Sequence, residues 1–88
     1  MTVWQLLELL IFTLTIMHKL KAIANKIRNT RIFRNYTQYY LAAKLKISQN
    51  AYSKIELGRT KVSVEKLLTI ADVLEVDACE LISAEQGK

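Results

Sequence analysis

The chain has few of the residues from which catalytic and metal sites are usually built. Among its 88 residues there is one cysteine, one histidine and two glycines. The single Cys79 excludes an intramolecular disulfide and a cysteine cluster for a metal, and His18 has no second histidine to share one. No nucleophile stands with a base, and no glycine-rich phosphate loop occurs. These absences predict a protein that is not an enzyme, needs no cofactor or metal, and suits a reducing cytoplasm.

Acidic residues are missing from the whole segment between Glu8 and Glu56. Nine of the 13 lysines and arginines fall in that segment, whereas six of the eight acids follow Glu56. The net charge of +5 favours a polyanionic partner. So uneven a distribution predicts one positive surface suited to phosphates and a separate negative part of the fold.

Four short polar side chains mark predicted helix starts. Thr37, Ser48, Ser63 and Asp77 each follow an apolar residue and precede another apolar residue four positions on. That is the spacing of an N-cap inside a hydrophobic staple. No run alternates at period two without a better helical interpretation, so the sequence predicts an all-α fold.

Two apolar stripes complete the predicted core. The upstream stripe consists of Leu20, Ile23, Ala24 and Ile27. Asn35 is expected to end that helix, because asparagine tolerates a positive φ. The downstream stripe consists of Val64, Leu67, Leu68, Ala71 and Leu74. At this length the chain is one domain, predicted over residues 20–83, with 84–88 as a flexible tail.

The segment 37–56 predicts two short helices separated by a three-residue turn. Its second helix would carry an uncharged polar face, with Gln49 and Asn50 at its start and Ser53 and Lys54 one turn on. The opposite face would be apolar. An amide side chain both donates and accepts hydrogen bonds, which matches the edge of adenine in the major groove. This helix is therefore predicted to read DNA.

Over residues 27–82 the chain resembles the XRE family of helix-turn-helix regulators, which includes the lambdoid phage repressors and Cro. The residues that carry the resemblance are Arg31, Thr37, Gln38, Leu41, Ala42, Ile47, Ser48, Gln49, Tyr52, Ser53, Lys54, Ile55, Glu56, Gly58, Leu67, Ile70, Ala71 and Leu74. The resemblance implies a five-helix, lambda-repressor-like domain, here with an extra apolar N-terminal helix. It implies a sequence-specific transcriptional regulator, a repressor that binds a palindromic operator in double-stranded DNA as a homodimer through residues 49–57.

The resemblance also implies roles for single residues. Gln38, at the start of the second helix, would contact a phosphate, and Arg59 and Lys61 in the following loop would clamp others. The complete expected DNA-binding set is Gln38, Ser48, Gln49, Asn50, Ser53, Lys54, Arg59 and Lys61. Arg31 and Glu56 are implied to form a buried, structural ion pair.

Three positions depart from the family pattern. Asn35 stands where glycine is common, but asparagine adopts a left-handed backbone more easily than most residues. Lys46 stands in the turn between the second and third helices, where glycine is usual, so a left-handed backbone there would cost on the order of 1 kcal/mol. Tyr52 stands where a β-branched aliphatic residue is frequent. Its ring suits the core, but its hydroxyl needs a partner.

Residues 1–19 lie outside the resemblance and form a predicted apolar helix, capped by Thr2. The candidate dimerisation residues, spaced four and three apart as in a coiled-coil seam, are Val3, Leu7, Leu10, Leu14 and Met17. Self-association is the favoured interpretation; docking on its own domain or on a partner is the alternative. A membrane span is disfavoured because the stretch is shorter than about 20 residues. Met17 is also a candidate natural start.

Two other functions remain open from the sequence. The chain could be the antitoxin of a toxin–antitoxin pair, with the same DNA contacts and the apolar segment covering a toxin. It could also be a protein-interaction adaptor that uses the helix-turn-helix as a scaffold. A salt-sensitive shift of a specific duplex would separate a DNA-binding protein from an adaptor.

Overall fold

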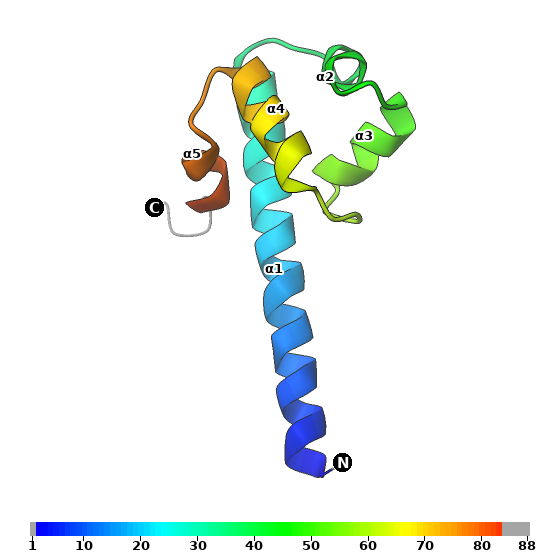
Figure 1. Ribbon diagram of the computed structural model, residues 1–88, viewed down its shortest axis with the longest axis vertical. Helices are drawn as coiled ribbons and strands as arrows, with labels where there is room; N and C mark the ends of the chain where they lie inside the picture. Colours follow the sequence, from blue (N-terminus) through cyan, green and yellow to red (C-terminus); the bar gives the residue numbers. More distant parts are fainter. Residues whose placement is uncertain (1, 84–88) are drawn as a thin grey trace.

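The structure is a computed structural model that describes residues 2–83 as an assembly of five α-helices (Figure 1). The helices are α1 (Val3–Phe33), α2 (Gln38–Leu45), α3 (Gln49–Glu56), α4 (Val64–Leu74) and α5 (Ala78–Ile82). The predicted all-α fold with five helices is confirmed, and residues 2–83 contain no strand. The predicted tail, 84–88, lies outside the described residues.

The apolar N-terminal segment is not a separate, extra helix as predicted. It is the first half of α1, which continues for 31 residues without a break. Thr2 caps this helix in a reciprocal pair of hydrogen bonds with Gln5, as a capping box. No glycine or proline interrupts α1, so nothing in its sequence would end the helix near residue 19. In Figure 1 helices α2 to α5 gather around the second half of α1, and its first half projects away from them.

Every predicted N-cap begins a helix. The side chains of Thr37, Ser48 and Ser63 each accept a hydrogen bond from the backbone N–H three residues on, and Asp77 accepts one from Cys79. Asn35 has a φ of 64° between α1 and α2, as expected for the residue that ends the first helix. Local capping therefore determines where α2 to α5 start.

The core lies where the second half of α1 meets the other helices. Its buried side chains are Ile27, Leu41, Ala42, Tyr52, Ile55, Ile70, Ala71, Leu74 and Leu81. The stripe predicted on α4 is partly wrong, because Val64 and Leu68 are 72% and 55% exposed. The inward face of α4 consists instead of Leu67, Ile70, Ala71 and Leu74. Contacts of α4 with α1, α2 and α5 select this face, which has the i, i+3, i+4, i+7 spacing.

Within residues 2–83, three residues other than glycine have a left-handed backbone. Asn35, Lys46 and Glu75 have φ angles of 64°, 60° and 61°. Lys46 and Glu75 are the C-caps of α2 and α4, where glycine is the usual residue. The left-handed backbone predicted at Lys46 is thus present, whereas the sequence analysis did not predict the one at Glu75.

Replacing Lys46 by glycine should stabilise the domain. A residue with a Cβ atom in this conformation costs about 1–2 kcal/mol, whereas the extra backbone freedom of glycine costs about 0.5–1 kcal/mol. We expect Lys46→Gly to raise the free energy of unfolding by about 0.5–1 kcal/mol in a urea titration. Lys44→Gly, inside α2, is the control and should lower it by about 1 kcal/mol. A loss of stability in Lys46→Gly would contradict the strain at this turn.

Candidate nucleic-acid interface

Helix α3 exposes the polar face that the sequence predicts. Its exposed or half-exposed polar residues are Gln49, Asn50, Ser53 and Lys54. Its buried residues are Tyr52, Ile55 and Glu56. Gln49 and Asn50 are not covered by the apolar half of α1, which runs away from the other helices (Figure 1). Both amides at the start of α3 are therefore accessible to a ligand.

The turn before α3 sets its direction. The backbone N–H of Ile47 donates to the carbonyl of Ala42 at 3.0 Å, which closes the end of α2. The hydroxyl of Ser48 then accepts from the N–H of Ala51 at 3.0 Å and starts α3. Ser48 itself is exposed, but its hydroxyl oxygen is used as a helix cap. These bonds hold α2 and α3 as one helix-turn-helix unit.

A single carboxylate connects this unit to α1. Oε2 of Glu56 accepts a hydrogen bond from Nε of Arg31 at 2.6 Å, and Oε1 accepts one from Nη2 at 3.0 Å. The hydroxyl of Tyr52 donates to Oε2 at 2.6 Å, and the side-chain amide of Gln38 donates to Oε1 at 3.0 Å. Arg31 also donates to the carbonyl of Tyr36 at 2.9 Å. The ion pair implied by the resemblance is present, at the centre of a larger cluster.

The cluster is shielded from water, since the side chains of Arg31 and Glu56 are 11% and 2% exposed. Burial by itself raises the pKa of Glu56, but hydrogen bonds from Arg31, Tyr52 and Gln38 outweigh it and bring the pKa below its usual value. Burial, followed by the hydrogen bond to Glu56, raises the pKa of Tyr52. The hydrogen bond with Glu56 raises the pKa of Arg31. At neutral pH the carboxylate is therefore charged and the phenol neutral.

The side chain of Gln38 contacts another residue of the domain, whereas the resemblance implies a contact with a phosphate. It is half-buried at the first position of α2, and its side-chain amide is engaged with Glu56. This bond ties the start of α2 to the end of α3. A contact between Gln38 and a phosphate remains a proposal, for which the backbone N–H groups of the first turn of α2 are also suited.

A groove runs between α3 and the start of α4. Its lining includes Ser48, Asn50, Lys54, Lys61, Ser63 and Lys66. Three lysines from α3, the loop and α4 thus meet in one concavity whose lining contains no acid. Lys66 was missed from the sequence, because only the tertiary placement of the start of α4 brings it to this groove. Arg59 is exposed in the loop but is not part of the lining.

Most acids lie away from this groove, although Glu65 is in the first turn of α4, next to Lys66. Asp72 and Glu75 are at the end of α4, and Asp77 and Glu80 are at the start of α5. Glu75 lies 3.7 Å from a guanidinium nitrogen of Arg34 at the end of α1. Four of the acids thus gather at the end of α4 and the start of α5, away from the lysines of the groove.

Comparison with known proteins agrees with this geometry. The helix-turn-helix family model matches residues 27–81, from the second half of α1 to α5. The chain therefore belongs to the XRE-like helix-turn-helix family of DNA-binding regulators. No curated protein and no solved structure gives a match. Within residues 2–83, no helix has the length and apolar character needed to cross a membrane.

Loss of the Glu56 carboxylate should destabilise the domain more than any change on the exposed face of α3. Glu56→Ala leaves the guanidinium of Arg31 buried without its partner, which typically costs about 3–5 kcal/mol. Gln49→Ala removes an exposed side chain and should change stability by less than about 0.5 kcal/mol. Thermal and urea unfolding of both variants measure the difference. Equal melting temperatures would show that the cluster is not the main stabilising contact.

The lowered pKa of Glu56 predicts that the folded domain loses stability as the pH falls. The unfolded chain binds the proton at about pH 4.3, whereas the folded chain binds it only at lower pH. The contribution of the Glu56 carboxylate to the free energy of unfolding is thus complete above about pH 5. It is lost as the pH falls toward the pKa of this group in the folded protein. The melting temperature between pH 7 and 3 should fall less in Glu56→Gln than in the parent protein, since the amide does not titrate. Parallel curves would contradict this assignment.

Proposed function

We propose that the protein is a sequence-specific transcriptional repressor that acts in the cytoplasm and binds a palindromic operator as a homodimer. Residues 49–57, which are α3 and its C-cap Leu57, would enter the major groove. The observation that carries the proposal is the pair of uncovered amides, Gln49 and Asn50, beside a groove lined by lysines. The Glu56 cluster supports it, because this cluster holds the reading helix in one orientation.

The two kinds of side chain would do different work. Gln49 and Asn50 lie in the first turn of α3 and are suited to pair with the N6/N7 edge of adenine. Lys54, Lys61 and Lys66 would neutralise phosphates, which positions the protein without specifying a sequence. Binding should therefore weaken steeply as the salt concentration rises.

A homodimer is proposed because one reading helix contacts too few base pairs for a unique site. Two copies related by a two-fold axis would double the contacted sequence, and the operator would have the same symmetry. Repression would follow from occupancy of the operator, which excludes other proteins from the same duplex. This mode of action needs no ligand.

Selection of bound duplexes from a random pool tests the proposal. We expect enrichment of a two-fold symmetric sequence. Gln49→Ala and Asn50→Ala should relax the preference at single base pairs, by about 1–3 kcal/mol of discrimination each. Lys61→Ala should weaken binding to all sequences. It should also reduce the slope of the logarithm of the binding constant against the logarithm of the salt concentration by about one.

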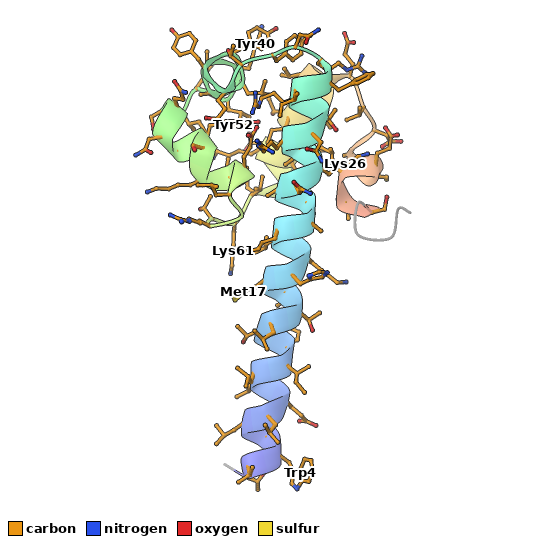
Figure 2. The ribbon with its side chains drawn as sticks, turned by 180° about the vertical axis from the view of Figure 1, so that it is seen from behind. Trp4, Met17, Lys26, Tyr40, Tyr52 and Lys61 are labelled. Carbon is orange, nitrogen blue, oxygen red and sulfur yellow. The ribbon has the colours of Figure 1, made fainter. Side chains whose placement is uncertain are left out.

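Lys26→Ala is the matched control for Lys61→Ala. Both lysines are exposed, but they lie on opposite sides of α1 (Figure 2). Lys26 is not part of the groove between α3 and α4. The control should bind with unchanged affinity and salt dependence. No enriched sequence, or an equal effect of both lysine substitutions, would overturn the proposed function.

A further inference from the structure

The first half of α1 has an apolar surface that nothing in residues 2–83 covers. Its large apolar side chains between residues 3 and 17 are 39–77% exposed, and Trp4 is the most exposed of them. Figure 2 shows Trp4 at the far end of α1 and Met17 closer to the other helices. Surfaces of this kind on water-exposed proteins mark sites of association. We define residues 3–17 as the stalk.

The stalk has one continuous aliphatic line, formed by Val3, Leu7, Leu10, Leu14 and Met17. With about 100° between successive helix residues, Glu8 and Lys19 lie on the other side of α1. The next position in the same four-three series is Lys21. A Cβ atom on Gly58 would lie 3.2 Å from Cα and 2.9 Å from Cγ of Lys21. The aliphatic line therefore leads directly to the C-terminal end of α3.

This placement decides how two stalks can pair. Paired helices lie about 8–10 Å apart. In a parallel pair, the α3 ends of both copies would have to occupy the same gap between the two α1 helices. In an antiparallel pair, each α3 end meets only the N-terminal end of the other stalk. We infer that two copies of this chain pair antiparallel through their stalks.

The spacing of the line also suggests a register. Leu7, Leu10, Leu14 and Met17 are three, four and three residues apart, a pattern that reads the same in both directions. Leu7 of one copy then faces Met17 of the other, and Leu10 faces Leu14. In an antiparallel coiled coil this alignment buries all four positions in matched layers.

A groove of mixed polar and apolar lining lies where the partner stalk would end. This groove beside α1 is lined by His18, Lys21, Ala22, Asn25, Glu56 and Leu57, and Leu57 is 53% exposed. In this register the partner stalk ends at the level of Lys21, where Gly58 already lies against α1. The partner's first turn would therefore stop against the C-terminal end of α3, with its Trp4 beside the groove. The stalk line, Trp4 and Leu57 together would bury roughly 1,000 Å² over both copies. That is about the lower limit for a specific interface.

The pairing has a consequence that rests on the proposed function. The two-fold axis would pass about nine residues from Lys21, which puts the C-terminal ends of the two α3 helices roughly 27 Å apart along α1. The rest of each α3 rises from this end away from the stalk (Figure 1). The bodies of the two helices are therefore farther apart than their C-terminal ends, which fits half-sites one DNA turn, about 34 Å, apart.

Disulfide cross-linking of the full chain tests the pairing without DNA. In a Cys79→Ser background, mild oxidation of Leu7→Cys mixed with Met17→Cys should give a cross-linked dimer of one copy of each. Neither variant alone should cross-link, because its own cysteines would be about 15 Å apart, beyond the reach of a disulfide. Cross-linking of each variant with itself would establish a parallel pair and overturn the inference.

Sedimentation provides a second readout. Leu10→Lys should convert the dimer to a monomer, whereas Leu9→Lys, an equally exposed residue outside the aliphatic line, should leave it a dimer. A monomeric parent protein, equal effects of both substitutions, or binding of the stalk to phosphatidylglycerol vesicles in place of dimerisation would overturn the inference. Loss of sequence selection with intact cross-linking would instead contradict only the proposed function.

Discussion

The structure depends most on the carboxylate of Glu56. It is the last residue of α3, yet its two oxygens accept hydrogen bonds from α1, α2 and α3 itself. A buried ion pair alone is weak evidence for stability, because desolvation offsets much of the attraction. Here Tyr52 and Gln38 supply further donors, so the carboxylate is compensated. The result is a fixed angle between α1 and the helix that carries Gln49 and Asn50.

Tyr52 shows how one substitution within the family pattern serves both packing and polarity. Its ring is completely buried in the core, and its hydroxyl reaches Glu56 at 2.6 Å. An aliphatic residue at this position would fill the core but leave one oxygen of the carboxylate with a single donor. The aromatic residue therefore extends the cluster from the end of α3 to its middle, with Glu56 still at the centre. This explains why the departure from the pattern is compatible with the fold.

Features determined by local chemistry could be predicted from the sequence. The N-caps Thr37, Ser48, Ser63 and Asp77 depend on short-range hydrogen bonds, and all four begin helices. Features determined by packing could not. The inward face of α4, the place of Lys66 in the groove and the left-handed Glu75 all follow from how α4 lies against its neighbours. The uninterrupted α1 was also missed, because the family pattern begins only at Ile27 and suggested a boundary that no residue enforces.

The continuity of α1 links the stalk mechanically to the reading helix. A separate N-terminal helix on a flexible joint could fold back and cover the apolar faces of its own domain. A single helix of 31 residues cannot, since bending it would break backbone hydrogen bonds that no proline or glycine has already removed. Within residues 2–83 the stalk is therefore left uncovered, which is why we propose a second copy of the chain as its partner. Because the Arg31–Glu56 ion pair and the close approach of Gly58 to Lys21 both join the end of α3 to the same helix, the proposed pairing of stalks would also set the separation of the two polar faces.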